Sequence, residues 1–407
     1  AGLVYPGDAG VPRGGYKTDK NNIVARLAFA WDPNGRGRTS VRGAWGIFYD
    51  TVAGQGDLFQ AGVLAPPFTP LLQLDGGRTN LIPIADPFSA QTTGPNLFPP
   101  NLVIIGWGPE FDTPSAQHYN LTVQQQIGDN MGLEVGYVGS RGKNLPIFIE
   151  INPAINGVRK FPAFNLLRPT FSVAESWYNS LQASLRMRPT NGVNFLASYT
   201  LSDAKDHVSG LNIGGERRPG LPATIGDEAS FDAVLAQEKG PALFDARHRF
   251  VISFGAELPK LEDKSAAMRN VLGGWQLNGI FQAQTGFPFT VNDNTSLSGL
   301  TNRPNATCDP NEGAPHTVEQ WFNTNCFERK DRSASGESSQ TRNSVRGPGF
   351  NRTDLSIFKN FTFSGDKRIQ IRIEGFNIFN QERFGNPVNA ITAGNFGALT
   401  SSEEGRI

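Results

Sequence analysis

The feature that most constrains this chain is an alternation of apolar and polar residues that has a period of two and continues for about ten residues at a time. In the first such tract, Ile23, Leu27 and Phe29 fall on one face and Arg26 falls on the other. Successive side chains point to opposite faces along an extended strand. The pattern predicts ten strands, at residues 22–31, 40–49, 117–127, 132–139, 178–188, 193–202, 246–258, 274–285, 353–363 and 368–379.

The predicted strands are longer than those of an average soluble domain. Most tracts cover about nine to thirteen residues, whereas a strand in a soluble protein averages about five or six. A tilted strand that crosses the hydrocarbon layer of a bilayer needs about nine to eleven residues. The strand lengths therefore favour a sheet that spans a membrane.

The links between the predicted strands alternate in length. Short turns at one rim and long loops at the other are typical of outer-membrane barrels, in which the outer rim carries recognition. A soluble sandwich or propeller gives no reason for this alternation, and the chain has no fixed repeat length. The short links are at 32–39, 128–132, 189–192 and 364–368, with a somewhat longer one at 259–273, and the long links are at 51–114, 140–176, 203–244 and 286–350.

The two faces of the predicted strands differ in chemistry. One face is apolar, and the other carries too many charged and amide side chains for a packed core. A wet lumen accommodates such groups while the apolar face contacts lipid. We therefore predict an all-β, antiparallel transmembrane barrel in the bacterial outer membrane. The residues expected to face the lumen include Arg42, Arg186, Arg247, Arg249, Gln276, Gln282, Arg372 and Glu374.

Aromatic residues recur near the ends of the predicted strands, at Trp31, Trp45, Tyr49, Trp177 and Trp275. A ring with one polar atom is favoured at the level of the lipid headgroups. For any single one of these residues, ordinary packing in a protein core is the alternative explanation. Their recurrence supports the membrane interpretation.

Composition excludes several classes of protein. Lys plus Arg and Asp plus Glu both number 37, so the chain has no basic field for nucleic acid. Its apolar runs, such as residues 102–107, are far shorter than the roughly 20 residues that a membrane helix needs. Residues 1–8 show no signal-peptide pattern, so we expect any export signal to lie upstream or to have been removed.

The two cysteines, Cys308 and Cys326, lie in a segment rich in Asn, Pro and Thr that is predicted to be a loop. Two cysteines so close together in a polar loop are suited to a disulfide in an oxidising compartment. The alternative is a pair of free thiols in a reducing cell. We expect the disulfide.

No pattern in the sequence indicates catalysis or a bound metal. The four histidines, at 118, 207, 248 and 316, lack the spacing of a helical zinc site. Ser140 lacks the glycine two positions before it that a nucleophile elbow needs, and Gly139 and Gly142 suggest a tight loop there instead. We therefore predict no catalytic residue, no cofactor and no metal site.

The densest charged cluster within a predicted strand contains Asp245, Arg247, His248 and Arg249. The two arginines share a face and could line the lumen against a plug or an anionic solute. They could also pair with Glu257, Glu374 or another lumen carboxylate across neighbouring strands. The second interpretation is favoured.

Several segments together resemble the Oar-like TonB-dependent transporters over nearly the whole chain. None of these segments is a catalytic signature, so the resemblance concerns architecture. The segments are residues 21–33, 40–50, 244–251, 273–289 and 346–380.

The resemblance implies a plug domain inside the barrel and a TonB complex that energises it, and neither is visible in this sequence. It also implies that the chain begins about midway round a barrel of some twenty-two strands. The chain then stops at Gly405, Arg406 and Ile407, before the aromatic-ended closing strand. The expected partners are outer-membrane lipid and, for the whole protein, the plug and the TonB complex.

Three functions compete at this stage. The leading one is energy-coupled transport of a bulky substrate across the outer membrane. The second is a structural or adhesive surface protein that transports nothing, and the third, disfavoured by strand length, is a soluble carbohydrate-binding sandwich or propeller. A plug domain and coupling motif upstream would separate the first two. The sequence does not name the substrate.

Overall fold

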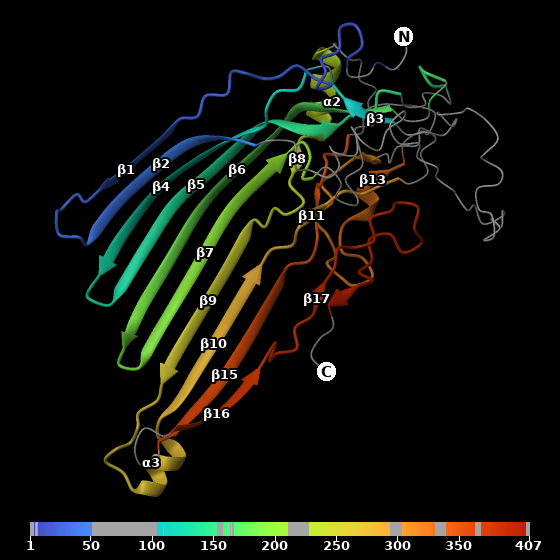
Figure 1. The fold of residues 1–407 in the computed structure, drawn as a ribbon. Coiled ribbons are helices and arrows are strands. Elements are labelled where there is room, and N and C mark those ends of the chain that lie inside the picture. Colours follow the sequence, from blue (N-terminus) through green and yellow to red (C-terminus); the bar gives the residue numbers. More distant parts are fainter. Residues whose placement is uncertain are drawn as a thin grey trace, which may run out of the picture.

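The computed structural model describes residues 4, 7–50, 104–108, 110–152, 158–162, 164, 167–210, 228–293, 303–329, 339–362 and 368–403. Its main feature is one long antiparallel sheet in which ten strands follow one another (Figure 1). The ten strands, in this order, are β1 (Arg26–Trp31), β2 (Thr39–Tyr49), β4 (Ser115–Ile127), β5 (Met131–Phe148), β6 (Leu167–Thr190), β7 (Val193–Asp206), β9 (His248–Glu257), β10 (Trp275–Gln284), β15 (Phe350–Thr362) and β16 (Arg368–Gly375).

All ten predicted strands are present, and the all-β antiparallel prediction is confirmed. The largest errors concern β5 and β6, which extend well beyond the predicted strands and shorten the link predicted at 140–176. Ser140 therefore lies inside β5, paired with His118 and Tyr178, and the tight loop predicted there is wrong. The alternation of apolar and polar residues stops near this point although the backbone pairing continues.

The short links at 32–39, 128–132 and 189–192 form tight turns at one end of the sheet, which is the lower end in Figure 1, whereas most of the link predicted at 364–368 lies outside the described residues. In the first turn, the Asp32 carboxylate accepts hydrogen bonds from the backbone N–H groups of Asn34 (3.2 Å) and Gly37 (2.7 Å). In the turn between β6 and β7, Asn191 and Gly192 have φ values of 52° and 80°, which is the left-handed geometry of a two-residue hairpin. The long links gather at the opposite end (Figure 1). Most of the link predicted at 51–114, and residues 405–407, lie outside the described residues.

Neighbouring strands are displaced along one another in a consistent direction. A single row of paired residues runs through six pairings from Val41 in β2 to Ala283 in β10. In β2, Val41 is the large apolar residue nearest the short-turn end on this face of the sheet. In β10 the corresponding residue is Trp275, which lies eight residues nearer that end than Ala283, the residue in the same row as Val41. With about 3.3 Å per residue and about 4.8 Å between strands, this displacement tilts the strands by roughly 40°, as in outer-membrane barrels.

The remaining elements are short and lie mainly in the long links. No helix among the described residues is long and apolar enough to cross a bilayer. These elements are β3 (Ile104–Trp107), α2 (Glu228–Glu238), β8 (Gly240–Pro241), α3 (Ala266–Leu272), β11 (Pro288–Phe289), β12 (Asn305–Ala306), η2 (Thr324–Cys326), β13 (Phe327–Glu328), β14 (Val345–Arg346), β17 (Arg383–Phe384) and β18 (Ser402–Glu403).

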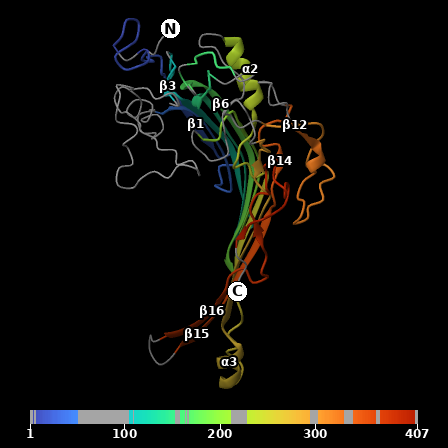
Figure 2. The same ribbon diagram turned by 90° about the vertical axis from the view of Figure 1, so that its right-hand side faces the viewer.

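The buried apolar clusters of the described residues lie at the loop end of the molecule. One cluster joins Ile147 and Phe171, in the extended parts of β5 and β6, to Val234 of α2. The other surrounds Phe322 and Cys326 in the link between β10 and β15. Figure 2 shows the sheet at right angles to Figure 1, with the loops gathered at one end. The loops thus have cores of their own, which the tilted part of the sheet lacks.

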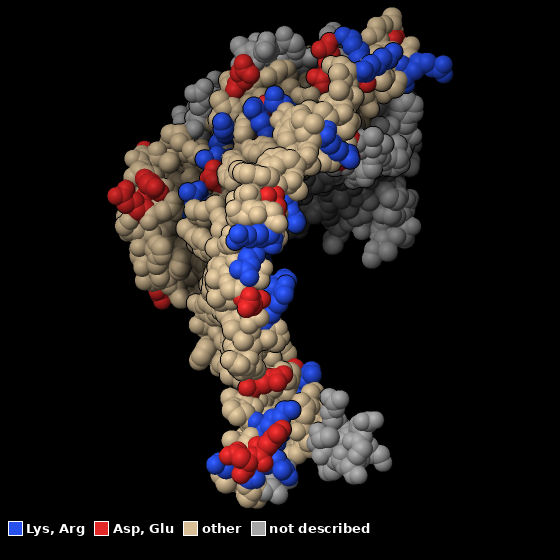
Figure 3. Space-filling model, turned by 90° about the vertical axis from the view of Figure 1, so that its left-hand side faces the viewer, with Lys and Arg blue, Asp and Glu red and all other residues tan. Residues whose placement is uncertain are grey.

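The sheet is curved and open. Among the described residues, β1 and β16 each have a neighbouring strand on one side only. Figure 3 looks onto the side where β1 lies and shows a wall with a hollow, and Lys and Arg side chains border that hollow. The open arrangement is consistent with the expectation that these ten strands belong to a larger barrel.

Candidate functional site: a polar wall below ion-paired loops

Residues that pair across neighbouring strands lie on the same face of the sheet, so the strand register assigns every strand residue to one of two faces. We call the first the apolar face. Its members in β1 to β16 include Leu27, Phe29, Trp31, Val41, Trp45, Leu121, Val123, Val135, Tyr137, Leu181, Leu185, Phe195, Tyr199, Phe250, Ile252, Phe254, Leu277, Phe281, Leu355, Ile357, Ile371 and Ile373.

Many side chains of the apolar face are not covered by protein. Leu27 is 70% exposed and Ile373 is 64% exposed, and comparable values occur in strands between them. Apolar surface in water costs about 25 cal/mol per Å², and monomeric soluble proteins rarely expose contiguous apolar patches larger than a few hundred Å². A face of this extent requires an apolar surrounding.

The aromatic residues of this face are not all at strand ends. Trp31 and Tyr49 end their strands and Trp275 begins β10. Trp45, however, lies in the interior of β2, and Trp177 lies ten residues inside β6 because that strand begins at Leu167. The prediction that these two tryptophans mark strand ends is therefore wrong.

The opposite face of the sheet, which we call the polar face, carries seven of the eight side chains predicted for the lumen. Small residues and a few apolar ones, such as Ile280, lie between them. Each of the seven lies within a strand, at a position that alternates with the residues of the apolar face. The seven are Arg42, Arg186, Arg249, Gln276, Gln282, Arg372 and Glu374.

Side chains of the polar face bind one another along and across strands. The amide of Gln124 donates to Glu134 (2.6 Å), and the guanidinium of Arg372 lies 3.5 Å from the Glu374 carboxylate. The carbon at the centre of that guanidinium is also 4.2 Å from the ring centre of Phe358. These exposed contacts contribute little stability individually, at about 0–1 kcal/mol each. The polar face is thus a hydrated surface that presents hydrogen-bonding groups.

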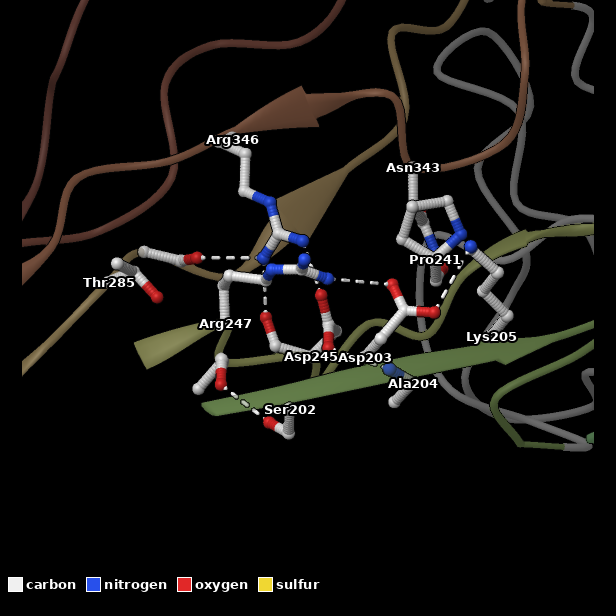
Figure 4. Close-up of polar contacts among 12 residues, drawn as sticks. Ser202, Asp203, Ala204, Lys205, Pro241, Asp245, Arg247, Thr285, Asn343 and Arg346 are labelled. Carbon is white, nitrogen blue, oxygen red and sulfur yellow. Dashed lines mark hydrogen bonds and ion pairs between the residues drawn. The ribbon is translucent and has the colours of Figure 1, made fainter. Parts of the chain in front are cut away.

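Arg247 differs from the other seven residues predicted for the lumen. It lies just before β9, and its guanidinium donates to the Asp203 carboxylate (3.1 Å; Figure 4). The strand register places Asp203 on the apolar face, in the same row as Asn179 and two residues beyond Leu201. Arg247 therefore contacts the upper rim of that face. Its partner is a carboxylate on a neighbouring strand, but it is neither Glu257 nor Glu374, and it does not lie on the face predicted for the lumen.

Three ion pairs fix the link between β10 and β15, two of them to the upper ends of β7 and β9 and one to α2. Arg346 binds the carboxylate of Asp245, and its guanidinium also donates to the Asp245 carbonyl oxygen (2.7 Å; Figure 4). Arg342 binds the carboxylate of Asp206, and both side chains are 4% exposed.

The third ion pair joins Arg303 to the α2 residue Glu238 at 2.8 Å. All three arginines come from the link between β10 and β15. Breaking one such buried pair typically costs 3–5 kcal/mol because it leaves a charge without a partner. The long link is therefore held in one position over the sheet.

Sequence reasoning did not predict this set of ion pairs. Their partners are far apart in the chain, so no local spacing reveals them. The available signal was that Asp245 and Arg346 lie inside the segments that carry the family resemblance, at the ends of two predicted links. Asp206 and Arg342 gave no such signal.

Cys308 and Cys326 are joined by a disulfide in the same link, with their Cα atoms 5.0 Å apart. Cys326 is fully buried in the cluster around Phe322 and Phe327. The disulfide thus connects a surface segment to the core of the link.

His207 lies directly after β7 and is 7% exposed. Its Nδ1 accepts a hydrogen bond from the backbone N–H of Glu175 (3.0 Å), and its ring lies 5.2 Å from that of Trp177. Burial, aided by the nearby cations Lys239 and Arg342, lowers the pKa of His207 to about 4, and Glu175 partly opposes this shift. His207 is therefore neutral at pH 7 and acts as an acceptor.

The described residues contain no group of three or more His, Cys, Asp or Glu side chains that could hold a metal ion.

Comparisons with known proteins agree with this geometry. Residues 1–407 match a family described as "Outer membrane beta barrel domain". No curated protein matches the sequence. Among solved structures, the outer membrane transporter YddB of Escherichia coli is similar in fold, with a TM-score of 0.51 and 10% identity over 94% of this chain and 39% of that one. The ferric-catecholate import receptor Fiu of E. coli K12 aligns with a TM-score of 0.42 and 9% identity, over 93% of this chain and 33% of that one.

Proposed function

The chain belongs to the outer membrane beta-barrel domain family, and from this premise we propose that it forms part of the wall of a transporter that carries a bulky substrate across the outer membrane. The protein is located in the outer membrane. The chain spans 39% of the length of YddB, so activity is proposed for the whole protein of which this wall is a part.

The observation that carries the proposal is the division of ten tilted strands into one apolar face and one polar face. Lipid covers the first face, and the second lines a water-filled lumen. The seven polar-face residues named above are proposed to face that lumen, and Arg247 is proposed to hold the rim through Asp203. The interior of a barrel needs such polar groups only where it encloses water, a plug or a solute.

The open edges of β1 and β16 support the proposal that the barrel is completed by further strands. An unpaired backbone group in lipid costs several kcal/mol, so neither edge is stable alone in a bilayer. We extend the proposal to a plug domain within the complete barrel and to energy coupling through a TonB complex, in agreement with the resemblance to Oar-like transporters. The role proposed for the described wall is not catalytic.

The face assignment is tested with single-cysteine variants in outer-membrane preparations. Gln282→Cys should react with a water-soluble maleimide after the lumen is opened with denaturant or by removal of a plug, whereas Leu277→Cys should remain protected in the folded barrel. The native cysteines do not interfere, because they form the disulfide. Labelling of Leu277→Cys as fast as that of Gln282→Cys, in a folded barrel whose plug has been removed, would contradict a lipid-facing apolar face.

Transport is tested in the native host by comparing the spent medium of wild-type cells with that of a strain lacking the gene. Transport predicts that at least one compound is left unused by the deletion strain. The alternative, a structural or adhesive surface protein, is kept in view because the long link has its own buried cluster and disulfide. That alternative predicts unchanged media and reduced attachment of the cells.

A further inference from the structure

The link between β9 and β10 differs from the other short links because it contains a helix, α3 (Ala266–Leu272), at the short-turn end of the sheet (Figures 1 and 2). Its N-cap is Ser265, whose side chain accepts a weak hydrogen bond (3.4 Å) from the N–H of Met268. Neither the family match nor the fold explains why a turn on this rim should contain a helix.

Two residues of the apolar face hold the C-terminal end of α3. The indole N–H of Trp275 donates to the carbonyl oxygen of Val271 (2.8 Å). The ammonium of Lys359, which pairs in register with Trp275, donates to the carbonyl oxygens of Gly273 and Val271. A cation at this position satisfies the unpaired carbonyl groups at the end of a helix and favours its dipole. The helix is therefore attached to the lipid-facing side of the sheet.

Lys359 also shows how a charge is accommodated on that side. It is 3% exposed, and its ammonium lies 5.1 Å from the ring centre of Trp275 and 5.4 Å from that of Phe361. Aromatic rings that surround a cation in this way are typical of the interface between water and hydrocarbon. The level of α3 is thus the edge of the apolar band.

The apolar side chains of α3 are not covered by protein. Met268, Val271 and Leu272 are 45%, 63% and 56% exposed. Their spacing of three and four residues places them on one side of the helix. The exposed charged residues around α3 are three cations, Lys260, Lys264 and Arg269, and two anions, Glu262 and Asp263.

We propose that α3 is an interfacial helix that lies on the periplasmic leaflet of the outer membrane, with Met268, Val271 and Leu272 inserted at the boundary between headgroups and acyl chains. Two observations identify phospholipid as the occupant. The exposed apolar side chains continue the lipid-facing band past Trp275, and the surrounding cations match the phosphate of the headgroups. The helix would fix the depth of the barrel at this rim. The inference rests on the proposed membrane-spanning wall.

The test uses nitroxide labels on three single-cysteine variants of the whole protein, reconstituted in bilayers of phosphatidylethanolamine and phosphatidylglycerol. Val271→Cys reports on the apolar side of α3, and Lys264→Cys is the matched control on the polar approach to the same helix. Leu277→Cys reports on the lipid-facing side of the wall, two residues past Trp275. The measurement is the collision rate of each label with oxygen and with a water-soluble nickel complex.

At Val271→Cys we expect oxygen collisions to exceed nickel collisions, and at Lys264→Cys we expect the reverse. If the label at 277 reports lipid but the label at 271 reports water, the interfacial helix is overturned and the wall stands. Low collision rates with both reagents at 271 would show a protein partner on α3 and would also overturn the inference. Water at both 271 and 277 would instead refute the proposed wall.

Discussion

The guanidinium of Arg342, in the link between β10 and β15, is paired with the carboxylate of Asp206 at the upper end of β7, and the two residues are 136 positions apart in the chain. Arg342 also donates to the carbonyl oxygens of Asp206 (2.7 Å) and Glu238 (2.9 Å). One side chain thus connects the long link, the end of the sheet and α2. This arrangement makes the position of the link sensitive to a single carboxylate.

We expect Asp206→Asn to loosen the link between β10 and β15 at a cost of about 3–5 kcal/mol, because the buried guanidinium of Arg342 loses the charge of the Asp206 carboxylate. Hydrogen exchange of the link should increase strongly. Asp263→Asn is the control: Asp263 is 73% exposed in its pair with Lys264, so its loss should change stability by about 1 kcal/mol or less. Equal exchange in the two variants would show that the buried pair does not hold the link.

The apolar and polar faces are compared most directly at two adjacent residues of β9. Phe254→Arg places a charge on the lipid-facing side and should destabilise the folded barrel by about 2–4 kcal/mol near the midplane. Ser253→Arg lies at nearly the same depth on the polar face and should cost little. Reversible urea unfolding in lipid vesicles measures both values. Similar penalties for the two variants would contradict the barrel.

Removal of the disulfide should affect the link locally. The bond between Cys308 and Cys326 closes a loop of 18 sequence positions, and its loss should destabilise that segment by roughly 3 kcal/mol in the chain-entropy model. Limited proteolysis of a variant with serine at both positions should cut the segment sooner than in the parent protein, with the strands unaffected. Mass spectrometry of protein from native outer membranes should find the two residues bonded, and free thiols would contradict the pairing.

The pKa of His207 predicts a dependence of stability on pH. Because this pKa is lowered to about 4 in the folded state from 6.5, the folded state binds fewer protons than the unfolded state between these values. The stability of the region is therefore full above about pH 6.5 and decreases as the pH falls towards 4. The protection factor of the Glu175 amide, which donates to His207, should fall over this range. In His207→Asn, which retains an acceptor but does not titrate, that fall should be absent.

Much of the wall could be predicted from sequence because each strand carries its own information. Alternation along one strand, as at Phe254 and Ser253, depends only on which neighbour faces lipid and which faces water. The limits of the prediction follow from the same cause. Beyond the apolar band, β5 and β6 continue next to loop elements such as α2, so the alternation ends while the pairing does not. The end of β5, the start of β6 and the position of Trp177 were therefore misjudged.

The sequence by itself determined the strands, their two faces and the alternation of short and long links, because these features depend on residues that are neighbours in the chain. Only the tertiary structure decided how far each strand is displaced along the next, which arginine pairs with which carboxylate, and where α3 lies. These features depend on contacts between distant residues, such as Arg342 with Asp206 and Lys359 with the end of α3. Local periodicity carries no information about such partners, since many pairings satisfy the same alternation and only packing selects one of them.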